Sequence, residues 1–330
     1  MRLGVIGAGR IIPFHLDAFQ EAGFKITTIG ASSNSKNAYN LAQKYKIQNV
    51  LKSGSNILDF QDEYDCLLVA PKSEFLFDYL RLLQNSNKPI LIEKPVLVDR
   101  NQLDGVNQIE KLFPKVMVAF NRRYYRSIQQ FNTSINQRAI GTFEFRIPEC
   151  SNLNFVPKNI ICNTLINNTI HAIDLISYLF HVDLDNCNVN VFSDRHSIFE
   201  ITIDFARSKF PGRASITFGV PGNYELIFKA FGHLLELKPL EVFNDYTGVR
   251  VLEPTVNMPI RLYQPESARE IIEYSKSNSE KLFKPGFLEQ SISFRKFVET
   301  GSFSDQSAKL EEAIKLAKFI FGLNDRIMSG

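Results

Sequence analysis

The fold is decided by the stretch LGVIGAGRII, which occupies residues 3–12. Residues 3–6 are mostly apolar and predict a short buried strand that runs into a glycine turn and then a helix. Strand, glycine turn and helix in this order form the phosphate-binding unit of dinucleotide-binding folds. Gly7 would permit the tight turn, and Gly9 would let the main chain approach a pyrophosphate beside the free N–H groups of the helix. Two glycines in an ordinary strand-to-helix turn are the alternative interpretation.

Buried strands and amphipathic helices continue to alternate as far as residue 120. We predict further strands at 25–30, 49–51, 66–70, 89–92 and 116–120, and helices at 37–46, 73–84 and 99–112. Apolar strands that alternate with helices specify an α/β fold with a doubly wound parallel sheet, the Rossmann arrangement. We expect residues 1–120 to form this dinucleotide-binding domain.

The end of the second strand bears on which dinucleotide is bound. An acidic residue about twenty positions after the glycine turn would hold the ribose hydroxyls of NAD. Residues 30–36 read GASSNSK and contain no carboxylate. Ser32, Ser33 and Lys36 could instead bind a 2'-phosphate, so NADP(H) is favoured over NAD(H). The alternative is that these serines only cap the helix that begins near Asn37.

A lysine follows the strand at 89–92, in the sequence Glu93-Lys94-Pro95. Open α/β sheets bind ligands at the carboxyl ends of their parallel strands, so Lys94 is the first catalytic candidate. Glu93 is expected at the cofactor site, where it would pair with a neighbouring cation rather than touch the substrate. Other residues at these strand ends are expected to contact the cofactor, namely Arg10, Ile11, Ala70 and Pro71. Arg122 and Arg123 follow the last strand and either bind substrate hydroxyls or phosphate, or form a solvated face.

Beyond residue 126 the pattern changes to alternation with a period of two. Residues 199–205 alternate apolar and polar side chains, and shorter strand-like runs follow at 214–220, 224–231, 234–237 and 249–252. Helical patterns flank them at 165–180, 287–299 and 310–324. We therefore expect residues 121–330 to form an α+β domain with a largely antiparallel, open-faced sheet.

Composition limits the class of protein. The chain has 330 residues, of which 44% are hydrophobic, and its net charge is only +3, which gives little support for binding nucleic acid or a membrane surface. The four cysteines show no metal-ligand or disulfide spacing, and no metal site is expected. No apolar run approaches about 20 residues, and the first strand lies close to Met1. These features favour a cytoplasmic setting.

Five motifs together resemble the glucose-fructose oxidoreductase and inositol dehydrogenase family. They are the glycine turn, Ala70-Pro71, Glu93-Lys94-Pro95, Phe120-Asn121-Arg122-Arg123 and His171-Ala172-Ile173-Asp174, and the late stretch at 294–301 adds to them. The resemblance implies oxidation or reduction of a secondary alcohol or ketone on a sugar, polyol or nucleotide-linked sugar. It also implies a cis Lys94-Pro95 bond and a homodimer or homotetramer that associates through the outer face of the second-domain sheet.

The chemistry that this resemblance implies needs a group to accept the proton of the alcohol. His171 suits that role, and Asn167, His171 and Asp174 are spaced to share one helical face. We expect Lys94 and His171 to be catalytic, and Asn167, Asp174, Arg122 and Arg123 to bind substrate. A core role for His171, and pairing of Asp174 within its own domain, are the structural alternatives.

The chain departs from the family's pattern beside the histidine. Asn167 stands where the family has an aspartate, and Ile161-Cys162-Asn163-Thr164 replaces the usual glycines. Phe75 occupies a place where many relatives carry a histidine. An amide can orient an imidazole but cannot stabilise its charged form as a carboxylate does, so proton transfer would lean on Lys94. A catalytically silent, dinucleotide-binding sensor or partner, and a reductase of a non-sugar carbonyl such as a dihydrodiol or a tetrapyrrole, remain alternative functions.

Overall fold

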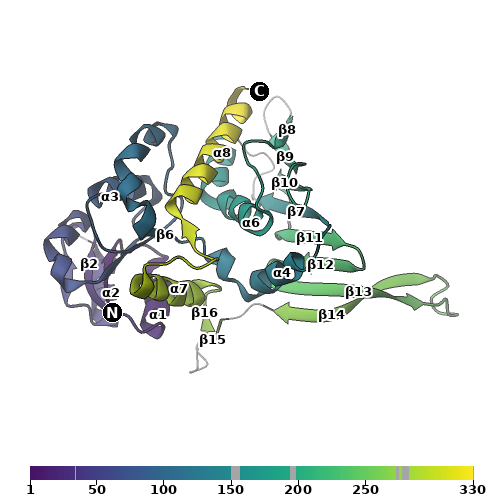
Figure 1. The fold of residues 1–330 in the computed structure, drawn as a ribbon, viewed down its shortest axis with the longest axis horizontal. Helices are drawn as coiled ribbons and strands as arrows, with labels where there is room; N and C mark the ends of the chain where they lie inside the picture. Colours follow the sequence, from purple (N-terminus) through teal and green to yellow (C-terminus); the bar gives the residue numbers. More distant parts are fainter. Residues whose placement is uncertain (34, 150–156, 194–197, 273–274, 277–281, 330) are drawn as a thin grey trace. The chain divides into compact units, whose positions relative to one another are not determined.

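The structure of the protein is a computed structural model that describes residues 1–330 except 34, 150–156, 194–197, 273–274, 277–281 and 330 (Figure 1). The chain divides into two compact units. The first comprises Met1–Tyr124, Leu165–Asp174 and Tyr274–Asp325, and the second comprises Tyr125–Thr164, Leu175–Glu273 and Arg326–Gly330. The predicted functional division between residues 120 and 121 stays a prediction.

The first unit is built on a seven-stranded sheet with the order β17-β6-β5-β4-β1-β2-β3. Its strands are β1 (Arg2–Ile6), β2 (Lys25–Gly30), β3 (Asn49–Leu51), β4 (Cys66–Val69), β5 (Ile90–Ile92), β6 (Val116–Val118) and β17 (Ala308–Lys309). All neighbouring pairs are parallel except β17 with β6. Sheet order reverses between β1 and β4, and open α/β sheets bind ligands at such a switch point.

Helical segments cover both faces of this sheet because its strands are apolar on both faces. The core on one face contains side chains from α1 (Ile12–Glu21), α2 (Lys36–Tyr45) and α7 (Phe287–Thr300). The other helical segments of this part of the chain are η1 (Gly54–Glu63), η2 (Ser73–Phe75), α3 (Leu76–Leu82), η3 (Arg100–Lys115) and η4 (Asn121–Tyr124). The short strands β15 (Ser275–Lys276) and β16 (Leu282–Phe283) pair with each other.

Local sequence explains several boundaries of these helices. Ser35 caps α2 by accepting a hydrogen bond from the main-chain N–H of Ala38. Asp99 and Gln102 form a capping box at the start of η3. Helix α7 stops at Gly301, whose φ of +70° is the left-handed geometry of a glycine C-cap. The region predicted as an α-helix at 99–112 is instead a run of 3-10 turns that ends around Pro114, a residue that cannot continue a regular helix.

The second unit carries an eight-stranded sheet with the order β14-β13-β12-β11-β7-β10-β9-β8. The strands are β7 (Thr142–Glu149), β8 (Asn188–Ser193), β9 (Ile198–Phe205), β10 (Gly212–Phe218), β11 (Glu225–Ala230), β12 (His233–Leu237), β13 (Val242–Leu252) and β14 (Leu262–Ile272). Only β7 and β10 pair in parallel, so the sheet is largely antiparallel as predicted. The helices α4 (Arg126–Asn136) and α5 (Lys158–Thr164) belong to this unit.

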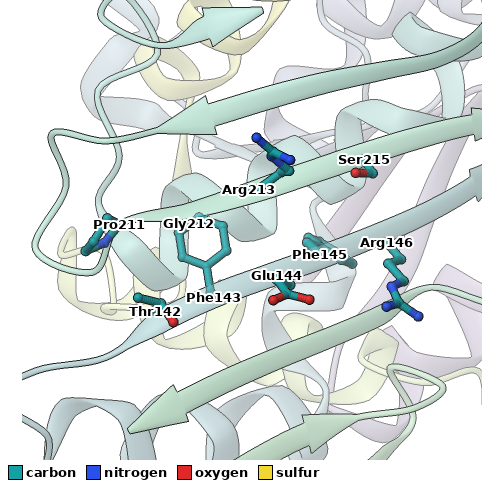
Figure 2. A pocket seen from close by; sticks show the side chains of 9 residues that line it. All are labelled: Thr142, Phe143, Glu144, Phe145, Arg146, Pro211, Gly212, Arg213 and Ser215. Carbon is teal, nitrogen blue, oxygen red and sulfur yellow. The ribbon is translucent and has the colours of Figure 1, made fainter. Parts of the chain in front are cut away.

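One face of this second sheet is apolar and the other is charged. Phe143, Phe145 and Ile147 of β7 are buried, whereas Glu144 and Arg146 point to the opposite face. The ring of Phe143 stacks on Phe180 with centroids 3.9 Å apart. Figure 2 shows a hollow on the charged face, lined by residues of β7 and β10 and their flanks.

The remaining helices lie at or across the boundaries between the two units along the chain. They are the π-helical turn η5 (Leu165–Thr169), α6 (Ile170–Phe180) and α8 (Leu310–Ser329). The turn η5 belongs to the first unit, and α6 and α8 begin in the first unit and end in the second. The single helix predicted at 165–180 is thus a π turn followed by an α-helix. In the described residues, no helix combines the length and apolarity required to span a membrane.

Candidate active site

The glycine turn between β1 and α1 is held tightly against the end of β4. The main chain at Gly7 has a φ of +112°, and its N–H donates a 2.8 Å hydrogen bond to the carbonyl oxygen of Gly30. A Cβ atom at position 7 would lie 2.3 Å from the carbonyl oxygen of Ala70. A Cβ atom at Gly9 would meet no described heavy atom within 4 Å. The turn therefore needs glycine at position 7 for its own packing, and it leaves open space at position 9.

The start of α1 has the character of an anion-binding helix terminus. It has no side-chain cap and no acidic residue in its first turn, and Pro13 stands in that turn. Its first N–H groups and the positive end of its dipole can therefore favour a phosphate. Ile12 stands where the motif usually has a small residue. Its side chain is fully buried in the hydrophobic core. Arg10 is exposed at the turn.

The residues after β2 include the serines and the lysine that were predicted to contact the cofactor. Ser32, Ser33 and Lys36 are exposed. The capping interpretation holds for Ser35, whose hydroxyl accepts from the Ala38 N–H at 3.3 Å. It does not extend to Ser32 or Ser33, whose hydroxyl groups cap nothing among the described residues.

The Glu93-Lys94-Pro95 sequence lies directly after β5, and its Lys94-Pro95 peptide bond is cis, as the family resemblance implied. One carboxylate oxygen of Glu93 lies 2.7 Å from Nε2 of His15, and the other accepts a 3.2 Å hydrogen bond from the main-chain N–H of Lys94. Burial alone would raise the pKa of Glu93, but the hydrogen bond and charge of His15 outweigh this and lower it. Glu93 is therefore an ionised carboxylate with both oxygens engaged.

The ammonium of Lys94 lies against the turn that leads into α6. Its Nζ donates a 2.6 Å hydrogen bond to the main-chain carbonyl oxygen of Asn167, in the π turn η5. Helical segments of this kind recur at functional sites. The sequence analysis placed the side chain of Asn167 on one α-helical face with His171. That placement stays a prediction; the structure adds that Asn167 lies in a π turn and presents its main-chain oxygen to Lys94.

The charge of Lys94 is destabilised by its surroundings. Burial lowers its pKa from the ordinary value, and the carboxylate of Glu93 acts against this effect. The positive charges of Arg122 and Lys284 add to the lowering. Lys94 is thus closer to giving up its proton at neutral pH than an exposed lysine is.

His171 is buried in the first turn of α6, with 9% of its surface exposed. Its ring meets that of Phe120 edge to face, with centroids 5.8 Å apart. Burial lowers the pKa of His171 well below 6.5, and the charge of Lys94 lowers it further. Within the described part of the chain, its Nδ1 has no hydrogen-bond partner. His171 is therefore a neutral imidazole, and none of the carboxylates that the structure describes is bonded to it.

Arg123 and Asp174 form a buried ion pair. Arg123 Nε and Nη2 donate to the carboxylate of Asp174 at 2.6–3.1 Å, and Nη2 also pairs with Glu312 at 2.9 Å. The side chains of Arg123 and Asp174 are only 4% and 1% exposed. Their predicted contact with substrate stays untested, but this geometry favours the alternative of a pair within the domain. The pair joins η4 to α6, the helix that carries His171.

Residues 1–120 match the model of a family described as an oxidoreductase family with an NAD-binding Rossmann fold. The resemblance drawn from the sequence is confirmed for these residues. The enzyme class predicted from the sequence, an oxidoreductase, agrees with this family, and a comparison with curated proteins found no match.

Solved structures similar to the whole chain show the same fold. A dehydrogenase from Clostridium difficile is 19% identical, with 99% of each chain covered and a TM-score of 0.69. An oxidoreductase from Agrobacterium radiobacter, solved with NAD+, L-tartaric acid and magnesium, is 11% identical over 97% of this chain and 94% of that one, with a TM-score of 0.72. UDP-N-acetylglucosamine 3-dehydrogenase from Acidithiobacillus ferrooxidans is 13% identical over 99% and 96%, with a TM-score of 0.68. The predicted fold class, a Rossmann domain and a largely antiparallel sheet domain, is confirmed.

Two features of this site were missed by the sequence analysis. His15 contacts Glu93, and the signal for it was present, because Ile12, His15, Leu16 and Phe19 form one buried stripe at helical spacing. Lys284 contributes charge at Lys94 and His171, and nothing in its local sequence indicates this. The hollow in Figure 2 lies on the other unit, and none of the predicted site residues lines it.

Proposed function

We propose that this chain is an NADP(H)-preferring oxidoreductase that moves a hydride between the nicotinamide and a secondary alcohol or ketone. The proposed substrate is a sugar, a polyol or a nucleotide-linked sugar. The observation that carries the proposal is the hydrogen bond from Lys94 to the Asn167 carbonyl, which places the ammonium on the turn that leads into His171. Both residues lie in the unit that contains the glycine turn.

The residues of the glycine turn fit a dinucleotide. Open space at Gly9 and the uncapped start of α1 would accept a pyrophosphate, with Arg10 and Ile11 at the same turn. Ala70, Pro71 and Glu93 stand at the neighbouring strand ends, where the rest of the dinucleotide would lie. When bound, the cofactor supplies the hydride acceptor or donor.

The exposed side chains after β2 support NADP(H) over NAD(H). Ser32 and Ser33 can donate hydrogen bonds to a 2'-phosphate, and Lys36 can neutralise part of its charge. The stretch 30–36 contains no carboxylate to hold the two ribose hydroxyls of NAD(H). Binding of NADPH is therefore expected to be tighter than binding of NADH.

Lys94 and His171 would together stabilise charge and transfer a proton at the substrate oxygen. In reduction, the ammonium of Lys94 stabilises the negative charge that develops on the oxygen and gives it a proton, which its lowered pKa makes easier. In oxidation, the unprotonated amine of Lys94 or the neutral imidazole of His171 accepts the hydroxyl proton. Arg122 and Asn167 are proposed to contact the substrate, whereas Arg123 and Asp174 hold α6 in place.

A cofactor titration followed by a turnover assay tests the proposal. Calorimetry with NADPH and NADH comes first, and then the oxidation of NADPH or reduction of NADP+ is followed with a panel of nucleotide sugars, free sugars and polyols. We expect Lys94→Met to bind NADPH normally and to lose activity by about a hundredfold or more, as when a group that stabilises an oxyanion is removed. Lys111→Met, an exposed lysine on η3, is the matched control. Protein that binds neither dinucleotide would overturn the proposal.

A catalytically silent relative is the second candidate, and one observation favours it. The ammonium of Lys94 is already bonded to a main-chain carbonyl, and an amide residue, Asn167, occupies the position from which a carboxylate would support His171. Such a protein would bind NADPH in the titration and turn over no member of the panel. Turnover that is lost in Lys94→Met would exclude it.

A further inference from the structure

A buried histidine of α1 contacts the residue that precedes Lys94. Nε2 of His15 lies 2.7 Å from Oε1 of Glu93, and the two side chains are 1% and 14% exposed. His15 stands in the first turn of α1, directly after the glycine turn. The positive end of this helix favours a carboxylate beside its first turn. None of the steps at the substrate oxygen described above uses His15.

Glu93 contacts both His15 and Lys94, the proposed catalytic lysine. Its second oxygen, Oε2, accepts a 3.2 Å hydrogen bond from the main-chain N–H of Lys94. Each oxygen of one carboxylate is therefore bound by a different element, Oε1 by α1 and Oε2 by the chain after β5. We propose that His15 is a positioning residue that fixes Lys94 through Glu93. The importance of this link rests on the proposed function of Lys94, but the link itself does not.

The direction of the hydrogen bond follows from the partners. The Glu93 carboxylate is ionised and can only accept, so Nε2 of His15 must carry the proton. Among the described residues, Nδ1 of His15 has no hydrogen-bond partner.

The ring of His15 is held by packing as well. It lies 4.7 Å from the ring of Phe287 and 6.3 Å from that of Phe19, measured between centroids. A buried ring packed against two other rings can hold the Glu93 carboxylate in one orientation. The charged or titratable groups that face Glu93 are His15 and Lys94. Those that act on Lys94 are Glu93, Arg122 and Lys284, and His171 lies in the same set of interacting charges.

The test uses two variants that differ in reach. In His15→Gln, the amide nitrogen stands as many bonds from the main chain as Nε2 of histidine, so it can still donate to Glu93. In His15→Asn, the amide nitrogen is one bond closer to the main chain and cannot reach. Leu16→Ala removes a buried side chain from the same helix without touching Glu93, and it controls for loss of packing.

Two measurements on the apo protein report on Lys94 and need neither cofactor nor substrate. The first is the hydrogen exchange of the Lys94 amide, followed by NMR. The second is the pH profile of acetylation of the Lys94 side chain by acetic anhydride, read by mass spectrometry. In His15→Asn we expect faster exchange at Lys94 while Leu91 and Ile92 in β5 stay protected. We also expect the acetylation profile to move to lower pH, by an amount on the order of one unit, because the anion beside Lys94 is no longer fixed.

His15→Gln is expected to restore both readouts, and Leu16→Ala to leave both at their wild-type values. The link is overturned if His15→Asn behaves as wild type, or if Leu16→Ala changes Lys94 to the same extent. Should His15→Asn fail to fold, Glu93→Gln decides, since loss of the anion must then shift the acetylation profile in the same direction. Failure of the proposed function would leave these readouts unchanged, because they require no turnover.

Discussion

At Gly7 the main chain adopts a φ of +112°, and a side chain there would collide with the carbonyl oxygen of Ala70. Gly9, two residues later, has an ordinary conformation and open space where its Cβ would be. Glycine is therefore favoured at the two positions of the motif for different physical reasons. Gly7 serves the fold, and Gly9 leaves room for whatever approaches the turn from outside.

Alanine at each of these positions separates the two reasons. We expect Gly7→Ala to lower the free energy of unfolding by more than about 1 kcal/mol, since the left-handed conformation and the contact with Ala70 both disfavour a Cβ. Gly9→Ala is expected to unfold like the wild type in urea but to bind NADPH more weakly in calorimetry. Equal effects of the two substitutions on stability, with no loss of NADPH binding in Gly9→Ala, would contradict this assignment.

Some candidate site residues could be predicted from the sequence because the strand just before them determines where they lie. Gly7, Gly9 and Lys94 follow buried strands, and parallel strands bring their carboxyl ends to one edge of the sheet. His15 escaped notice because its partner, Glu93, is 78 residues away and a histidine in an apolar stripe reads as core. Nothing local could indicate that Lys94 meets a main-chain oxygen of residue 167.

At the scale of elements, the pair Arg123–Asp174 joins η4, after the last parallel strand, to α6. A buried charge that loses its partner is costly, because the remaining ion keeps its desolvation penalty. We expect Arg123→Met to lower the free energy of unfolding by about 3–5 kcal/mol, measured in urea. The double variant Arg123→Met/Asp174→Leu should regain most of this loss.

Arg261→Met is the control for this prediction, because it breaks an exposed pair with Glu253. Exposed pairs are well hydrated without their partner, so we expect no measurable change in stability. A double variant as unstable as Arg123→Met alone would show that Arg123 acts through something other than the charge of Asp174. The same unfolding curves report whether η4 and α6 come apart before the rest of the unit.

Elements with strong local patterns were predicted best. The strands β2 and β3 have the predicted bounds, and β1, β4, β5 and β6 differ only at their ends. In contrast, β14 was missed, because its residues are almost all exposed and include Pro265 and several charged side chains, so no alternation is visible. The two-residue strand β17 is too short for any period, and only its pairing with β6 defines it. The residues of the π turn η5 are equally compatible with an ordinary α-helix, so its wider winding could not be predicted from the sequence.

For the whole molecule, the predicted association of subunits depends on the charged face of the second sheet (Figure 2). Arg213 of β10 stands between Asp204 of β9 and Glu144 of β7 in register, and Lys229 of β11 pairs with Glu144. Positive and negative side chains thus alternate across adjacent strands. A face with such alternation can complement a second copy of itself across a two-fold axis.

Association through this face should depend on salt, since exposed charges more than about 10 Å apart are screened at an ionic strength of 0.1 M. We expect sedimentation equilibrium to show a dimer or tetramer at low salt that weakens as sodium chloride is added. Arg213→Glu places three like charges in a row and should shift the equilibrium to monomer. Lys111→Glu, the reversal of another exposed charge, on η3, should leave it unchanged. A protein that stays monomeric at every salt concentration, or Arg213→Glu that associates like the wild type, would rule out this face as the interface.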